Sequence, residues 1–113
     1  MSALQRVAVH VAVVSGERLL TLDGALPWAL LAHGETPLAA ARRVLGPDLA
    51  LGRLLAVHDG RRRHDELDLH TVHLVQAGEL SGPGPAAAQW APVPDLEPRD
   101  WPLAADELVA LDP

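Results

Sequence analysis

The sequence predicts an α/β domain, in which a sheet of several strands packs against helices. Valines alternate with small or polar residues between positions 6 and 14, which is the two-residue period of a strand. The Thr36-Pro37 pair then opens a run rich in alanine and leucine, as is typical of a helix start. Further short apolar segments follow, and a second helical pattern lies near the end.

The first quarter of the chain is predicted to form a hairpin. A strand over 6–14 is followed by the turn Ser15-Gly16, and residues 17–22 return as a second strand. Asp23-Gly24 marks the next turn.

The helix predicted after Thr36 has a defined start and end. The Thr36 side chain can cap free N–H groups, and Pro37 is tolerated at the first helical position. Residues 38–45 have high helix propensity, and Gly46-Pro47 should end the helix.

The second half is predicted to contain three strands, two loops and a closing helix. The strands cover 53–58, 69–77 and 89–93, the loops 59–66 and 81–88, and the amphipathic helix 102–111. Pro92 places the last strand at a sheet edge, because proline cannot donate to a central ladder. No repeat or linker is visible, so residues 1–113 are expected to be a single domain.

Composition excludes several chemistries. The 113 residues carry a formal charge of −6 and include no Lys, Asn, Ile, Phe, Tyr or Cys, a bias that points to a high-GC bacterium. A thiolate nucleophile and a lysine Schiff base are therefore excluded, and the acidic balance argues against nucleic acid. We find no membrane-spanning run or leader peptide, so we expect a cytoplasmic protein without a membrane partner.

Residues 26–51 resemble the Nudix box of the Nudix (MutT-like) hydrolases, whose pattern is G-x5-E-x7-R-E-U-x-E-E-x-G-U, with U apolar. Gly34-Glu35 matches the first glutamate, Arg43 the arginine, and Leu45 and Leu51 the two apolar positions. The segment from Trp90 also resembles the Trp-x-Pro segment of the family. The resemblance implies an α/β/α sandwich, a mixed sheet with the box helix and a C-terminal helix.

The departures from the pattern fall on the residues that the family uses for chemistry. Val44 replaces the glutamate after the arginine, Pro47 and Asp48 replace the glutamate pair, and Ala29 and Ala50 replace the glycines. In the family this cluster holds the magnesium that activates water against a diphosphate. The resemblance therefore predicts the fold with a degenerate Nudix box, and we expect no metal and no cofactor.

Five residues of this region and the following loop are candidates for ligand binding, each with a structural alternative. Glu35 and Asp48 could meet a ligand, or favour a helix start and a turn. Arg43 could face an anion or be solvated, and Arg61 could bind a phosphate or lie in a charge-balanced loop. Trp28 could stack on a flat substrate or fill the vacated metal site as core.

His58, His70 and His73 are the candidate catalytic residues, because imidazole beside a carboxylate can transfer protons near neutral pH. His70 and His73 are separated by an odd number of residues, so they should lie on opposite faces of a strand. One of them could meet His58 across a hairpin, and His10, His58 and His70 could form a cluster in a cleft of the sheet. Ordinary surface or hydrogen-bonded histidines are the alternative.

The leading hypothesis is a degenerate Nudix-like domain that binds a small molecule or protein partner, with little or no magnesium-dependent pyrophosphohydrolase activity. The partner could be a second copy of the chain, as a homodimer. One alternative is an atypical Nudix-fold enzyme that uses histidine and carboxylate acid–base chemistry on a metabolite. Another is a weak nucleoside-diphosphate-type hydrolase.

Overall fold

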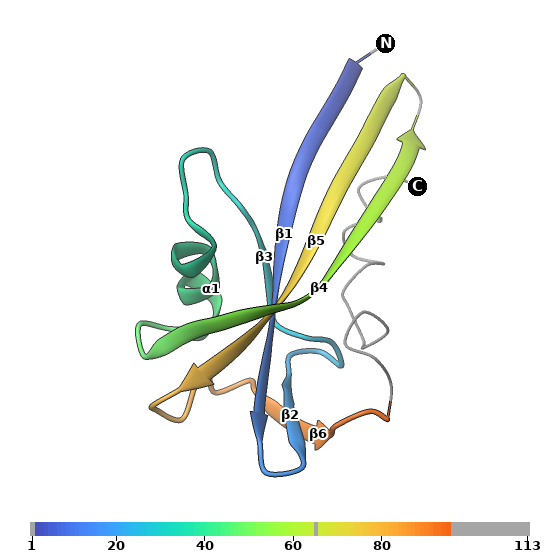
Figure 1. Ribbon diagram of the computed structural model, residues 1–113. Coiled ribbons are helices and arrows are strands. Elements are labelled where there is room, and N and C mark those ends of the chain that lie inside the picture. The colour runs from blue at the N-terminus through green and yellow to red at the C-terminus, as the bar shows by residue number, and fades with distance from the viewer. Residues whose placement is uncertain (1, 65, 96–113) are drawn as a thin grey trace.

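The computed structural model describes residues 2–64 and 66–95, which contain a mixed sheet and a helix (Figure 1). The elements are β1 (Ser2–Ser15), β2 (Arg18–Thr21), β3 (Trp28–Leu30), α1 (Pro37–Leu45), β4 (Leu49–His64), β5 (Leu67–Leu80) and β6 (Gln89–Pro92). The helix predicted at 102–111 lies outside these residues. No described segment forms a helix with the length and hydropathy needed to cross a membrane.

Strand β1 is the centre of the sheet. The strand order is β4-β5-β1-β2-β6, and β3 also pairs with β1. β1 runs parallel to β5 from Ser2 to Val13, and it pairs antiparallel with β3 and β2 along its other edge. β6 lies at the edge of the sheet, as Pro92 predicted.

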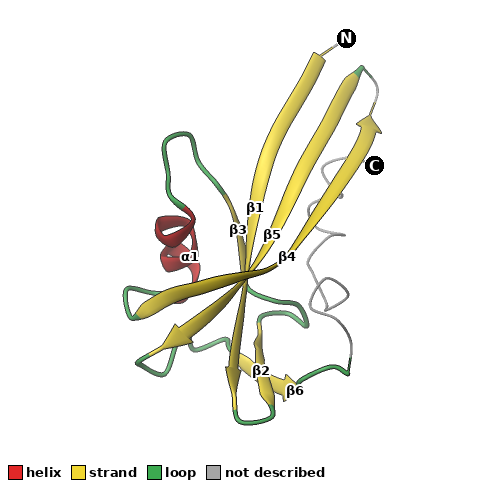
Figure 2. Ribbon diagram, viewed as in Figure 1, coloured by secondary structure: helices red, strands yellow, loops and turns green. Residues whose placement is uncertain are grey.

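The alternation along β1 produces a core on each face of the sheet. Val9, Val11 and Val13 pack with Ala41 and Leu45 of α1, which lies on one side of the sheet (Figure 2). The intervening residues face the other way, where a second core forms. Its buried members are Ala12, Leu19, Leu26 and Val75.

Helix α1 begins and ends where the sequence predicted. The Thr36 hydroxyl accepts a hydrogen bond from the Ala39 N–H at 3.1 Å, and Pro37 is the first helical residue. Gly46 ends the helix with φ 95°, a conformation that favours glycine, and its N–H donates to the Arg42 carbonyl at 2.8 Å. The box helix is therefore only nine residues long.

The strands differ from the sequence prediction mainly in two places. The segment 59–66 was predicted to be a loop, but β4 continues to His64 and pairs with β5 as far as Leu67. Its polar side chains resemble a loop sequence, whereas the strand is held by backbone pairing to its neighbour. Strand β3 was not predicted, because three residues are too few to show a period.

Gly78 should be a sensitive position in the sheet. A Cβ atom there would lie 2.5 Å from Val11 Cγ1 and 3.1 Å from Leu49 Cδ1, inside the core beneath α1. We expect Gly78→Ala to lower the free energy of unfolding by about 1–3 kcal/mol, because the core must shift. Urea unfolding measures this loss.

The matched control is Gly52→Ala, whose new Cβ would meet Ala77 Cβ at an ordinary 3.5 Å. This variant should unfold within about 1 kcal/mol of the parent. Equal stability of both variants would contradict the packing described for Gly78.

Candidate functional site

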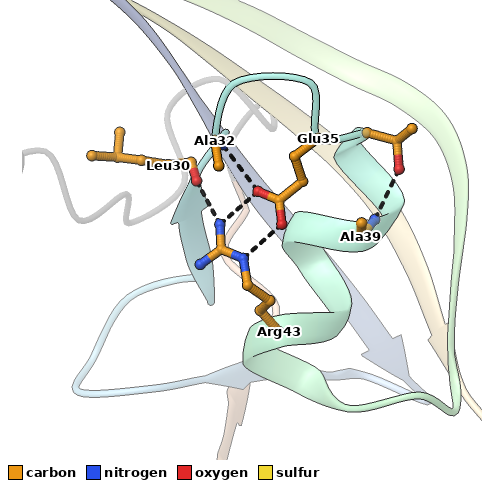
Figure 3. Close-up of polar contacts among 6 residues, drawn as sticks. Leu30, Ala32, Glu35, Ala39 and Arg43 are labelled. Atoms are coloured by element: carbon orange, nitrogen blue, oxygen red, sulfur yellow. Dashed lines mark hydrogen bonds and ion pairs between the residues drawn. The ribbon is translucent and has the colours of Figure 1, made fainter.

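Glu35 and Arg43 form a clamp between the helix and the loop before it (Figure 3). Arg43 Nε donates to Glu35 Oε2 at 2.7 Å, and Arg43 Nη2 donates to Glu35 Oε1 at 2.7 Å. The same Nη2 donates to the Leu30 carbonyl at 2.7 Å, and the Ala32 N–H donates to Glu35 Oε1 at 3.0 Å. Both carboxylate oxygens are therefore occupied within the protein.

The clamp also fixes the charge of its two members. The hydrogen bond from Arg43, with that from the Ala32 N–H, lowers the pKa of Glu35 to about 2. The same contact raises the pKa of Arg43. Glu35 is thus an anion that is matched by one neighbouring cation at any ordinary pH.

A cavity of about 380 Å³ lies at the C-terminal end of α1. Its lining includes Val44, Pro47 and Asp48, the positions where the Nudix pattern has glutamates. The other lining residues are Arg43, Leu45, Gly46, Leu80, Pro83, Gly84 and Pro85. The box region therefore keeps a hollow, but most of its wall is apolar.

A second hollow of about 480 Å³ borders the same helix from Thr36 to Pro47. Leu38 and Ala39 provide its apolar surface, while Arg42 and Arg43 provide its charge. Arg42 is partly engaged, since its Nε donates to the Leu49 carbonyl at 2.9 Å.

The residues around α1 do not fit a magnesium ion. Magnesium prefers several hard oxygen ligands in octahedral geometry, and the Glu35 oxygens are already bound by Arg43 and Ala32. Asp48 is then the one carboxylate left in the cavity wall. Across residues 2–64 and 66–95, no group of three His, Asp, Glu or Cys residues could hold a metal ion.

Three histidines form a row across the opposite face of the sheet. His10 Nε2 lies 2.9 Å from His73 Nδ1, and both side chains are buried. His58 pairs with His73 in the β4–β5 register, with ring centroids 5.6 Å apart, and is exposed. Trp28 of β3 pairs with His10 of β1, and the centroids of their rings lie 6.4 Å apart.

The buried hydrogen bond between His10 and His73 has a preferred direction. His10 Nδ1 has no partner among the described residues. An unpaired buried N–H costs more than an unpaired acceptor, so the His10 proton belongs on Nε2 and is donated to His73. Burial, followed by the nearby His73 and His58 charges, lowers the pKa of His10 from 6.5 to about 3. Burial also lowers the pKa of His73, as do His58 and Arg6.

His70 is separate from this row. Its Nε2 pairs with the Asp59 carboxylate, and both residues belong to the alternate positions of β5 and β4 that face away from His73. The predicted opposition of His70 and His73 is therefore present. The carboxylate expected beside the histidine pair is instead bound to His70.

The candidate residues thus divide among several places. Arg43 and Asp48 line the first cavity, and Glu35 holds Arg43. Trp28 lies beside His10 and is not among the lining residues of these two hollows. Arg61 is exposed on β4 opposite His70, within a strand rather than the expected loop.

Some residues of these sites were not among the sequence candidates. His10 was considered only in a cluster with His58 and His70, whereas its partner is His73. The position of His10 along β1 indicates which face of the sheet it occupies. The sequence does not show that β1 pairs in parallel with β5, which brings His10 to His73. Leu80 and the prolines of the cavity wall carry no chemical signature in the sequence.

The histidine row predicts a stability that falls as the solution becomes acidic. Unfolded histidine titrates near 6.5, but the folded His10 resists protonation down to about 3. The contribution of neutral His10 to the free energy of unfolding is therefore fully present above pH 6.5, and it is lost as the pH falls from 6.5 toward 3. Between about pH 7.5 and about pH 5.5, the loss should be about 1 kcal/mol from His10 alone.

Urea unfolding at each pH tests this expectation with His10→Leu, which should show a shallower loss than the parent. His33→Gln removes an exposed histidine and should keep the parental slope. If His10→Leu kept the full slope, the row would not be the source of the acid sensitivity.

Several solved structures have a fold similar to that of this chain. The chain is similar to the MutT NUDIX hydrolase from Burkholderia pseudomallei, with a TM-score of 0.62, 25% identity and 96% of each chain covered. It is also similar to a UDP-X diphosphatase, with a TM-score of 0.61 and 22% identity, over 88% of this chain and 59% of the other.

A third similar structure is the E. coli ORF135 protein, with a TM-score of 0.52 and 20% identity, over 92% of this chain and 84% of the other. No protein-family model and no curated protein matched the chain. The structural likenesses agree with the resemblance of residues 26–51 to the Nudix box, and the chain has a Nudix-like fold.

Proposed function

We propose that this chain is a binding domain with a degenerate Nudix box, which takes a small molecule or a protein partner. On this proposal it has little or no magnesium-dependent pyrophosphohydrolase activity. The observation that carries the proposal is the cavity at the end of α1, where Val44 and Pro47 occupy two of the positions of the family's glutamates. The hollow is retained, while Asp48 is the one carboxylate in its described wall.

The shortness of α1 supports this reading. In the Nudix pattern the glutamate pair follows the arginine within the helix, but here α1 ends at Leu45. Asp48 lies beyond the Gly46-Pro47 break, in the turn that leads to β4. It therefore cannot join Glu35 on one helical face, and Glu35 is already committed to Arg43.

Two similar structures are named as a hydrolase and a diphosphatase, and a shared fold does not by itself give a shared activity. The names of these structures support a small-molecule ligand. The volume of the cavity, about 380 Å³, also lies within the size range of small-molecule sites. The formal charge of −6 argues against a nucleic-acid partner.

A second candidate is an acid–base enzyme, which the adjacency of exposed His58 and buried His73 favours. It is weaker because Asp59, the nearest expected carboxylate, pairs with His70 on the other face. Neither His58 nor His73 lines the two hollows beside α1. Within residues 2–64 and 66–95, the histidine pair therefore has no carboxylate partner, and it lies outside these two hollows.

Magnesium should not stabilise the folded protein. A ligand that binds only the native state raises the unfolding midpoint, and the α1 region offers one free carboxylate. Thermal unfolding in millimolar magnesium chloride and in EDTA should give midpoints within about 1 °C of each other. A rise of several degrees with magnesium would reveal a metal site and support the hydrolase alternative.

Hydrolysis of nucleoside-diphosphate compounds should not exceed the rate in buffer alone, with either magnesium or manganese. The reason is the missing ligand set, and a phosphate-release panel measures the rate. Glu35→Gln and Asp48→Asn serve as the diagnostic variants. Robust turnover by the parent that either change abolishes would argue decisively against the proposed function.

A further inference from the structure

The cavity at the end of α1 has an unbalanced negative charge. Arg43 is its one cationic lining residue, and that charge is matched by Glu35 at 2.7 Å. Within residues 2–64 and 66–95, the Asp48 carboxylate has no ion-pair or hydrogen-bond partner. The wall therefore presents one uncompensated carboxylate to whatever enters.

The end of the helix adds to this negative potential. Leu45 and Gly46 line the cavity at the C-terminus of α1, where the helix dipole gives partial negative charge and favours cations. Arg42, the other basic residue of the last turn, lines the second hollow and not this one.

The remaining wall is poor in donors for an anion. Pro47, Pro83 and Pro85 have no backbone N–H, so this part of the wall cannot form the nest of amides that cradles a phosphate. Val44 and Leu80 add apolar surface and pack against the core beneath α1. A ligand with an apolar body would be in contact with these side chains.

We propose that this cavity binds a small organic cation, with its ammonium group on Asp48 and its apolar body against the proline and leucine wall. The inference rests on the proposed small-molecule role and names the ligand class. It requires no metal and no reaction.

Asp48 is held in place for this task by the loop that follows β5. The Ser81 N–H and hydroxyl donate to the Asp48 carbonyl at 3.3 and 3.2 Å, which fixes the backbone of the turn. A Cβ on Gly82 would lie 2.8 Å from Asp48 Oδ2, so the absence of a side chain there leaves the carboxylate uncovered.

Three probes of one skeleton and different charge test the proposal: phenethylamine, phenethyl alcohol and phenylpropionate. Each is titrated into isotope-labelled protein while amide shifts are followed at Val44, Leu45, Asp48 and Gly84. We expect the amine to bind at least about fivefold more tightly than the alcohol, as one favourable ion pair gives. Added salt should weaken the amine alone.

Asp48→Asn should bring the amine and alcohol affinities within about twofold of each other, because the charge is removed and the shape is kept. Asp23→Asn is the matched control, an exposed turn residue with φ 53°, a conformation that asparagine accepts. It should retain the parental preference for the amine.

The outcomes separate this proposal from the one on which it rests. Equal binding of all three probes at these amides would overturn the cation preference and leave small-molecule binding standing. Tighter binding of phenylpropionate would also overturn it. If no probe shifted these amides, the cation site would fail, and a small-molecule role would then depend on the second hollow beside α1.

Discussion

The pairing of β1 with three other strands is the constraint on which the rest of the structure depends. Its register with β5 is continuous from Ser2 to Val13, and its other edge holds β3 and then β2. Successive residues face opposite sides, so Val9 and Val11 meet α1 while His10 meets His73. A slip of one residue would turn the valines away from the helix and place His10 beneath it.

The same constraint keeps the two candidate sites apart. The cavity lies on the α1 side, with its floor against the valine core, whereas the histidine row lies on the other side. The sheet backbone separates the cavity from the histidine row, so His10 does not contact Asp48 and its protonation has no direct effect there. This is why the acid–base reading and the binding reading depend on different groups.

Sequence reasoning was most successful where the signal is local. Helix α1 begins after Thr36 and ends before Gly46, as predicted. Both ends could be predicted because helix capping depends on a few adjacent residues. The length of β4 was underestimated, because its residues 59–64 are held in the sheet by pairing with β5. That pairing cannot be seen in the sequence of the segment itself. The predicted grouping of the histidines was wrong for the same reason, because the His10–His73 contact depends on the parallel β1–β5 register.

The chemistry of the box follows from the energetic cost of clustered charge. Several carboxylates on one helical face repel each other unless a bound cation compensates them. Val44 and Pro47 remove that repulsion, and the remaining Glu35 is balanced within the protein by Arg43. The clamp therefore performs one task of the box, which is to hold the loop after β3 to the helix, without requiring a metal. What is left at the end of α1 is a hollow with largely apolar walls and one carboxylate, Asp48, and the proposed binding role rests on this arrangement.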